Sequence, residues 1–438
     1  MANTTLTRTF GTPSSTKTGT FSFWLKNLSS SGGGIFNNYG DANNRAILYI
    51  SNSQIDYYDA ATGTSISGTP QYRDTNGWYH VVLRIDTTQS SANDRTRVYV
   101  NGALQEATYG HTYNLNENSY MFTAGTPFVI GRDNSSGGSG DHLNAVISHF
   151  HYCDGQSYAP TVFGSTDSTT GEWKINTSPS MTMGNQGFTI LKDGNTITDQ
   201  SANSNNFSLG SGTLTKTEDN PSNVFATLNP LDNFFAQNTF SYGNTRQLTD
   251  NSRYAWSTST LGMTSGKYYC EVRHSGNIGD NYPEIGIAGR GLEDTSTALG
   301  TVHNTVSYQY NGQILINGTA SSFGSAYSST AIIGIALDVT NSKIYFSLNG
   351  VWQGSGNPTT GANGKTITTV STVRLGAYFF AGGDYGNSSR VTFDWNFGNG
   401  YFNSTAVSSA GTNASGNGIF EYDVPTGYTA LSTKGLNL

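Results

Sequence analysis

A hairpin pattern that occurs twice in the sequence decides how this chain can fold. Residues 332–353, IIGIALDVTNSKIYFSLNGVWQ, have the pattern of two β-strands closed by Asn349-Gly350. In the second strand Ile344, Phe346 and Leu348 occupy alternate positions, the period of two expected when one face of a sheet is buried. Asn and Gly tolerate the positive φ that a tight hairpin turn requires, so the pattern predicts a β-hairpin.

The earlier copy spans residues 81–105 and has the same order of features. Val81, Leu83 and Ile85 alternate, a polar loop follows Asp86, and a second strand leads into Asn101-Gly102. Both copies also place a Gln three residues after the Gly of the turn. The repeat predicts two related β domains in one chain.

Composition favours strands over helices throughout. The 438 residues are enough for two or three domains, each with a core of its own. Charged residues make up 12% of the chain, against about 25% in an average globular protein. Aromatic residues reach 12%, and Thr, Tyr, Phe and Val, which suit pleated strands, are abundant. We therefore expect an all-β protein.

Charge and hydropathy exclude two classes of partner. The formal net charge is −7 and no basic run occurs, which argues against binding to nucleic acid. No apolar run approaches the ~20 residues of a membrane span, and residues 1–24 lack the pattern of a secretion signal, so neither membrane insertion nor signal-directed secretion is expected. Cys153 and Cys270 fall one in each expected domain, so we predict two buried thiols.

Family resemblance refines the fold. The segments FSFWLK, GWYHVVLRID, RVYVNG and ISHFHYCDGQSYAPTVFG resemble a laminin-G-like, concanavalin-A-type lectin domain of the kind found in proteins of marine tailed phages, over residues 5–165. The later segments GKYYCEVRHSG, YPEIGIAGR, VSYQYNGQILING and VTFDWNFGNGYF resemble a SPRY domain, itself a concanavalin-A-type sandwich. The resemblance implies two concanavalin-A-like antiparallel jelly-roll sandwiches.

The expected division has four parts. Residues 1–165 form the first sandwich, 166–240 a Ser/Asn/Gly-rich connector with short strands, and 241–405 the second sandwich. Residues 406–438 form a C-terminal tail that packs on the second sandwich.

The sequence predicts no active site. Retaining glycosidases on this kind of fold use two carboxylates roughly 5 Å apart, in a Glu-x-Asp-x-x-Glu pattern that is missing. The nearest approach, Glu421-Tyr422-Asp423, has Thr426 where the second Glu would stand, and we interpret it as a turn. Serine-hydrolase, P-loop and zinc-protease signatures are also missing from the sequence.

Two groups of residues are candidate metal ligands. His149 and His151 share one face of a predicted strand, but a third ligand is not evident, so no transition metal is expected. Asp133, Asn134 and Asp141 flank the loop NSSGGSG, where calcium is the weaker alternative to a turn-forming role. No other cofactor is expected.

Two loop clusters are the candidate ligand sites, because sugars stack on Tyr and Trp rings while Asn and Asp hold their hydroxyls. The candidates are Tyr109, His111, Tyr113 and Asn114 in the first domain, and Tyr378, Asp384, Tyr385 and Asn387 in the second. Packing between sheets or between subunits is the alternative role for each of these aromatics. Three tryptophans in strand-like patterns are predicted to be core residues: Trp24, Trp78 and Trp395.

The resemblance implies a non-enzymatic virion surface protein of a tailed phage, either a fibre or spike that binds host glycans or a decoration protein. Its partners would be other virion proteins, copies of itself and host-surface polysaccharide. The alternatives from other classes are a secreted glycan-active enzyme and a SPRY-type protein-recognition adaptor.

Overall fold

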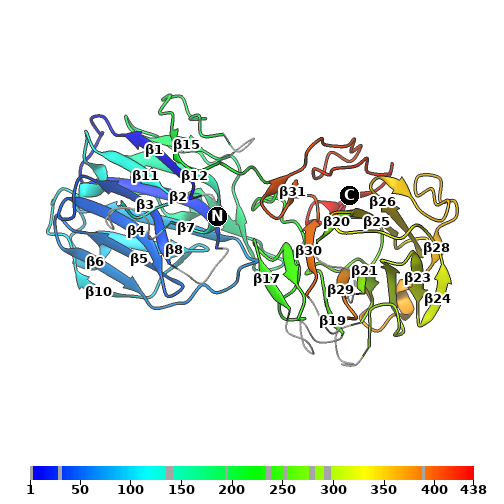
Figure 1. Cartoon of the computed structure of the whole chain (residues 1–438). Helices are drawn as coiled ribbons and strands as arrows, with labels where there is room; N and C mark the ends of the chain where they lie inside the picture. Colours follow the sequence, from blue (N-terminus) through cyan, green and yellow to red (C-terminus); the bar gives the residue numbers. More distant parts are fainter. Residues whose placement is uncertain are drawn as a thin grey trace. The chain divides into compact units, whose positions relative to one another are not determined.

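The computed structural model describes residues 3–27, 32–134, 142–192, 196–232, 238–250, 254–275, 282–290, 297–386 and 390–438. The chain divides into two compact units, Met1–Lys216 and Thr217–Leu438 (Figure 1). The described residues contain strands and short 3₁₀ turns but no α-helix, which confirms the all-β prediction. None of the described segments is a helix of the length and apolar character that crossing a membrane requires.

The first unit is a sandwich of two antiparallel sheets. The larger sheet has the order β10-β6-β5-β4-β3-β11-β1-β16. Its strands are β10 (Ala107–His111), β6 (Thr64–Gly68), β5 (Gln54–Asp59), β4 (Arg45–Ser51), β3 (Gly33–Tyr39), β11 (Pro127–Ile130), β1 (Thr5–Thr9) and β16 (Ser208–Ser211).

The smaller sheet of this unit has the order β15-β12-β2-β7-β8-β9. Its strands are β15 (Phe188–Ile190), β12 (Ala145–Asp154), β2 (Thr18–Asn27), β7 (Tyr79–Asp86), β8 (Thr96–Val100) and β9 (Ala103–Leu104), and a separate pair is formed by β13 (Gly164–Thr166) and β14 (Trp173–Ile175). The 3₁₀ turns are η1 (Ala92–Asp94), η2 (Tyr120–Phe122) and η4 (Pro160–Val162).

Aromatic rings fill the space between these two sheets. Phe21 on β2 stacks on Tyr152 of β12, with ring centroids 4.3 Å apart. Phe36 and Phe128 contribute from the facing sheet and lie within 5.6 Å of the Phe21 ring. Each of these side chains is fully buried, so the core rests on large apolar surfaces removed from water.

The second unit is also a sandwich of two sheets. One sheet has the order β17-β18-β30-β20-β25-β26-β27, with β28 beside β26 and β33 beside β20. Its strands are β17 (Thr239–Ser241), β18 (Arg246–Leu248), β30 (Thr392–Asn396), β20 (Lys267–Ser275), β25 (Ile332–Asp338), β26 (Lys343–Leu348), β27 (Val351–Trp352), β28 (Lys365–Thr366) and β33 (Thr429–Ala430).

The other sheet, six-stranded, has the order β19-β29-β21-β22-β23-β24. Its strands are β19 (Ala255–Thr258), β29 (Phe379–Asp384), β21 (Pro283–Ala288), β22 (Thr305–Gln309), β23 (Gln313–Ile316) and β24 (Thr319–Ser322). A separate pair is formed by β31 (Tyr401–Phe402) and β32 (Thr405–Ala406), and the 3₁₀ turns are η5 (Val370–Thr372) and η6 (Gly435–Asn437).

Both predicted hairpins are confirmed. Asn101 and Gly102 have φ values of 49° and 79°, and Asn349 and Gly350 have 47° and 80°. The Asn101 side chain accepts a hydrogen bond from the His80 amide at 2.8 Å, and Asn349 does the same with the Ile332 amide at 2.9 Å. Each Asn thus fixes both its own turn and the start of the hairpin's first strand.

The two units also share one strand topology. Strands β1 to β9, β11 and β12 correspond in chain order to β19 to β27, β29 and β30. Neighbours correspond as well: β12-β2-β7-β8-β9 matches β30-β20-β25-β26-β27, and β6-β5-β4-β3-β11-β1 matches β24-β23-β22-β21-β29-β19. The repeat seen in the sequence is therefore a repeat of whole sandwiches.

The boundary between the units differs from the expected division. The predicted connector, residues 166–240, is shared between the two bodies. Strand β15 pairs with β12, and β16 pairs with β1, so this part completes the first sandwich. Beyond residue 216, the Ala226 amide donates to the Leu431 carbonyl at 2.9 Å within the second unit.

The C-terminal tail packs on the outer face of the larger sheet of the second unit. Phe420 lies against Tyr269 of β20, with ring centroids 5.0 Å apart. The buried Glu271 carboxylate accepts hydrogen bonds from the amides of Glu421 and Tyr422 at 2.8 and 2.9 Å. One buried side chain on the sheet thereby fixes the path of the tail.

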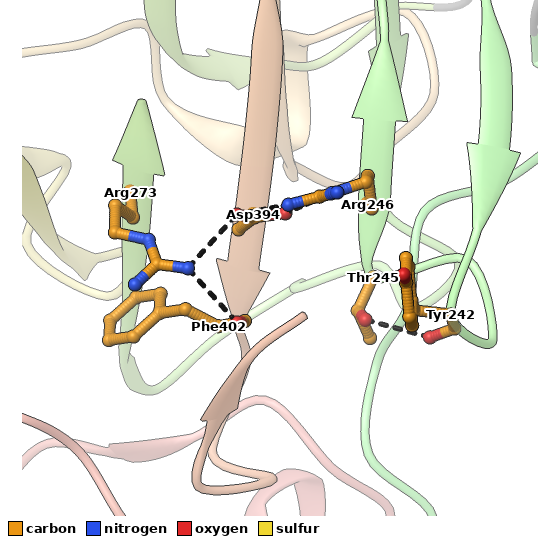
Figure 2. Close-up of polar contacts among 6 residues, drawn as sticks. All are labelled: Tyr242, Thr245, Arg246, Arg273, Asp394 and Phe402. Carbon is orange, nitrogen blue, oxygen red and sulfur yellow. Dashed lines mark hydrogen bonds and ion pairs between the residues drawn. The ribbon is translucent and has the colours of Figure 1, made fainter. Parts of the chain in front are cut away.

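A row of three charged side chains joins β18, β30 and β20 on the same outer face (Figure 2). Asp394 is only 1% exposed and accepts hydrogen bonds from Arg246 Nε at 2.6 Å and from Arg273 Nη2 at 3.2 Å. Arg246 packs over the Tyr242 ring and Arg273 over the Phe402 ring. Asp394 is bonded to both arginines, and each arginine packs over an aromatic ring. Such an arrangement is typical of a structural ion-pair network.

Candidate ligand-binding pocket

Four tyrosines gather at one edge of the six-stranded sheet in the second unit. Tyr254 directly precedes β19, Tyr385 directly follows β29, Tyr282 precedes β21 and Tyr310 follows β22. Because these antiparallel strands are neighbours in that order, all four positions lie at the same end of the strands. Centroid distances are 5.4 Å from Tyr254 to Tyr385, 5.6 Å from Tyr385 to Tyr282, and 5.4 Å from Tyr282 to Tyr310. We call this group the tyrosine rim.

A pocket of about 330 Å³ opens beside the rim on the outer face of the sheet. Glu284 and Gln309, a directly opposed pair on β21 and β22, line it together with Tyr254 and Tyr385. The remaining lining residues come from β23 and the segment before β22: Leu315, Thr297, Ala298 and Thr301.

The segment before β22 is tied down by three hydrogen bonds. Trp256 Nε1 donates to the Thr297 carbonyl at 3.1 Å, and Ser307 Oγ donates to the Leu299 carbonyl at 2.8 Å. The Gly300 amide donates to Thr305 Oγ1 at 2.9 Å. This wall of the pocket is therefore pre-formed, which lowers the entropy lost when a ligand binds.

The Glu284 carboxyl forms the polar floor of the pocket. It is 1% exposed, and its Oε1 accepts a hydrogen bond from Gln309 Nε2 at 2.8 Å. Among the described residues no group makes a well-formed hydrogen bond to its Oε2. Burial raises the pKa of Glu284 to about 8, although Gln309 and the Leu299 amide lower it. At neutral pH the carboxyl is thus mainly protonated and carries an O–H that can donate to a ligand.

Asp384 lies beneath the rim and positions it. Since Glu284 pairs with Gly383, alternation places the next residue, Asp384, on the opposite face of the sheet from Glu284. Its Oδ1 accepts hydrogen bonds from the Tyr282 amide at 2.9 Å and the Gly386 amide at 2.7 Å. One carboxylate therefore fixes the backbone beside two tyrosines of the rim.

The structure separates the residues of the second predicted cluster. Tyr385 is 36% exposed and lines the pocket, while Asp384 acts from below. Tyr378 was expected to contact ligand but is buried in the core, where its hydroxyl donates to the Thr368 carbonyl at 2.7 Å. Asn387 lies outside the described residues.

The first predicted cluster also contains a core residue. Tyr113 is fully buried and donates to Asp59 Oδ2 at 2.5 Å, so it is not available to a ligand. The burial of Tyr113 is possible because the buried Asp59 carboxylate accepts the hydrogen bond that a buried phenol must donate. Tyr109 packs partly buried against the core, whereas His111 and Asn114 are exposed.

The candidate metal ligands are engaged in other contacts. His149 Nδ1 is 2.7 Å from Ser148 Oγ, and His151 Nδ1 is 2.9 Å from Thr189 Oγ1. Burial lowers the pKa of His151 to about 3, so the imidazole is neutral. The described part of the chain holds no group of three or more His, Cys, Asp or Glu residues suited to a metal.

The described calcium candidates belong to no group of three or more His, Cys, Asp or Glu side chains that could hold a metal ion. Asp133 lies 3.9 Å from the Arg45 guanidinium, a cation that competes with a metal for the carboxylate. Asn134 adjoins it, and Asp141 lies outside the described residues. Both cysteines are buried free thiols, as predicted.

Sequence reasoning missed most of the pocket. The sequence patterns did not single out the tyrosines Tyr254, Tyr282 and Tyr310, nor the strand residues Glu284 and Gln309. The available signal was positional for two of them, because Tyr282 and Tyr310 flank runs of alternating apolar residues, NYPEIGIAG and TVSYQYNG.

Comparison with known proteins agrees with this fold. Residues 3–162 match the family described as "Concanavalin A-like lectin/glucanases superfamily". No curated protein sequence matches the chain. The predicted concanavalin-A-type domain in the first part of the chain is thus confirmed.

Several solved structures are similar at low identity. The chain is 17% identical to the SPRY domain of human HERC1, over 38% of this chain and 96% of that one, with a TM-score of 0.29. It is 18% identical to the heptameric SAP-like pentraxin of Limulus polyphemus, over 36% and 71%, with a TM-score of 0.27. It is 19% identical to stonustoxin, over 39% of this chain and about a quarter, 27%, of that one, with a TM-score of 0.28.

Together, the two sandwiches and the family match define a class of protein. The chain is a tandem of concanavalin-A-like β-sandwiches, a fold whose lectin-type members suggest recognition of carbohydrate or protein.

Proposed function

We propose that this chain is a non-enzymatic glycan-binding protein, displayed on the surface of a tailed-phage virion, and that the tyrosine-rimmed pocket of its second unit is its sugar site. The observation that carries the proposal is the pairing of exposed tyrosine rings with the buried Glu284 carboxyl at the pocket floor. Sugar rings stack their C–H faces on aromatic rings, and buried polar groups fix their hydroxyls.

The chemistry of the pocket favours an uncharged sugar. Its described lining residues include no Lys or Arg to pair with an acidic sugar. Gln309 offers an amide, Thr301 a hydroxyl, and Glu284 an O–H, all suited to neutral hydroxyl partners. An anionic sugar would therefore find no cationic side chain among these lining residues to offset the loss of its hydration.

Binding without hydrolysis fits the arrangement of carboxyl groups. Glycoside hydrolysis needs two carboxyls that flank one bond. Glu284 and Asp384 project from opposite faces of the sheet, so they do not flank a common substrate. Glu421, the other carboxylate considered, is bonded through its oxygens to Ser408 instead.

The virion setting explains the surface chemistry. A chain with 12% charged residues relies on Ser, Thr, Asn and Gly for solubility, and such a neutral surface packs against copies of itself or other virion proteins with little repulsion. Weak sites repeated on one particle give strong attachment through multivalency. We propose that neither calcium nor another cofactor is required.

Binding can be tested with a matched pair of variants. Tyr385→Ala removes a rim ring that is 36% exposed, and Tyr242→Ala removes one that is 40% exposed but lies outside the pocket. On an array of neutral and acidic glycans, we expect the wild type and Tyr242→Ala to bind neutral sugars, and Tyr385→Ala to lose at least about fivefold in affinity. Equal binding by all three proteins would contradict the assignment of the pocket.

The rival functions have their own tests. Reducing sugar released from host envelope polysaccharide by the wild type, and not by Glu284→Gln, would replace binding by hydrolysis. Mass spectrometry of gradient-purified virions and antibody labelling under the electron microscope test the location. Absence from virions would refute the structural role, and labelling of heads rather than tails would favour a decoration protein.

A further inference from the structure

The first unit offers a surface at the position that corresponds to the pocket of the second. Strands β3, β4 and β5 correspond in chain order and neighbours to β21, β22 and β23, whose outer face carries the pocket. The outer face of β3–β5 is therefore the place to look for a second site.

That face presents two tyrosines on adjacent strands. On β4, Leu48 points into the core, so alternation turns Ile47 and Tyr49 outward. On β5, Tyr57 points inward, so Asp56 and Tyr58 turn outward.

The register brings these side chains together. Tyr49 is directly opposite Asp56, and Ile47 is directly opposite Tyr58. The two tyrosines are diagonal neighbours, ~7–8 Å apart between the strands. Both are partly exposed, so they form one aromatic surface across two strands.

Polar groups surround the two rings. Arg45 lies 5.8 Å from the Tyr58 ring centroid and 3.9 Å from the Asp133 carboxylate. Burial raises the pKa of Tyr49, the charges of Asp56 and Asp133 add to the rise, and the charge of Arg45 opposes it. Asp56 is held in place by the Gly68 amide, which donates to its Oδ1 at 2.9 Å.

A buried acceptor in the same row has no hydrogen-bond partner within the described part of the chain. Asn37 on β3 is opposite Ile47, in line with Tyr58, and is 1% exposed. Its Nδ2 donates to the Arg132 carbonyl at 2.5 Å, but its Oδ1 makes no hydrogen bond to any described residue. A buried acceptor left in this state is a place where an ordered water can bond and bridge to a ligand.

We propose that this face, centred on Tyr49 and Tyr58, is a second saccharide site that binds an internal stretch of a neutral polysaccharide. Two rings on neighbouring strands offer successive stacking positions, which suits a run of sugars rather than one chain end. Arg45, Asp56 and Asp133 sum to one negative charge, which disfavours an acidic polymer. The chain would then carry two unlike sugar sites.

Affinity electrophoresis of the full chain can test the second site alone. The gels contain dextran, mannan or xylan as neutral polymers, and alginate as the acidic one. We use the background variant Tyr254→Ala/Tyr385→Ala, in which the pocket of the second unit is disabled, so that retained binding reports the first unit. Into it we introduce Tyr58→Ala, Tyr58→Phe, which keeps the ring, or Tyr242→Ala, a tyrosine that also stacks on an arginine but lies in the other unit. Thermal midpoints confirm that each variant is folded.

The expected result is that the background variant is retarded by a neutral polymer and not by alginate. Tyr58→Ala should weaken that retardation about fivefold, while Tyr58→Phe and Tyr242→Ala should leave it within about twofold. The second site is overturned if the background variant shows no retardation although the wild type does, a result that leaves the pocket intact. It is equally overturned if Tyr58→Ala matches Tyr242→Ala. Absence of retardation for the wild type in every gel would overturn both sites.

Discussion

Glu284 should make the stability of the second unit depend on pH in an unusual direction. Burial raises its pKa from 4.5 to about 8 in the folded protein. Between these values the native state keeps a proton that the unfolded chain has lost, so the free energy of unfolding falls as pH rises. Below pH ~4.5 and above pH ~8 this contribution is constant.

The magnitude follows from the difference between the two pKa values. One pH unit corresponds to about 1.4 kcal/mol per proton, so a rise from 4.5 to about 8 gives an upper limit of roughly 5 kcal/mol. Glu271, whose pKa burial raises to about 7, adds a smaller contribution of the same sign. Burial lowers the pKa of His274 in the same unit from 6.5 to about 4, so this group opposes the trend between these pH values. We therefore expect the clearest loss above pH 6.5, about 2 kcal/mol between pH 6.5 and pH 8.

The assay is urea unfolding and calorimetry of the full chain at pH 5, 6, 7, 8 and 9. In the wild type one of two transitions should move to lower temperature as pH rises. Glu284→Gln, an uncharged mimic of the protonated acid, should flatten most of that slope and should stabilise the unit at pH 8 relative to wild type. If that transition is independent of pH in the wild type, or shifts identically in Glu284→Gln, the buried protonated carboxyl is refuted.

Two further predictions concern the framework of the second unit. Replacing Asn349-Gly350 by Val-Val should destabilise its own unit by about 2 kcal/mol or more, because β-branched residues resist the positive φ of the turn, and calorimetry should show the transition of the first unit unmoved; a shift of both would contradict independent units. Asp394→Ala should cost about 1–3 kcal/mol, less than for a fully buried pair, because Arg246 and Arg273 are partly exposed and can rehydrate; a double variant with Arg273→Ala should then cost less than the sum of the single changes, and full additivity in urea unfolding would contradict the coupling.

The repeat in the sequence was sufficient to predict the two sandwiches, because the turn residues and the alternation act locally. Asn101-Gly102 and Asn349-Gly350 adopt the expected conformations and close the expected strand pairs. Trp24 and Trp395 are buried as predicted, while Trp78 is only partly buried. At these two hairpins, where both strands of the pair lie close in sequence, local pattern and tertiary structure agree.

The division of residues 166–240 was not accessible from local pattern. Strands β15 and β16 are short, and β16 is exposed along its length. Their partners β12 and β1 lie far away in the sequence, so neither alternation nor turn chemistry marks the pairing.

Only part of the candidate site was predicted, because its other residues are brought together by contacts between segments distant in sequence. Tyr385 was recognised because it stands in a polar, Gly-rich segment, whereas Glu284 was hidden in a regular strand. Glu284 is unusual because it is buried beneath the segment around Leu299. This contact forms only on folding, since the two residues are not neighbours in the sequence. Tyr113 and Tyr378 looked like exposed loop aromatics, but each found a buried hydrogen-bond acceptor.

The most direct test of the sugar site is amide hydrogen exchange of the full chain with and without a bound neutral polysaccharide. We predict protection of peptides that contain Pro283–Ala288 and Thr305–Gln309, together with the flanking tyrosines of the rim, and loss of that protection in Tyr385→Ala. Protection elsewhere in the second unit with these strands unchanged, or binding without any protection of that sheet edge, would contradict the account.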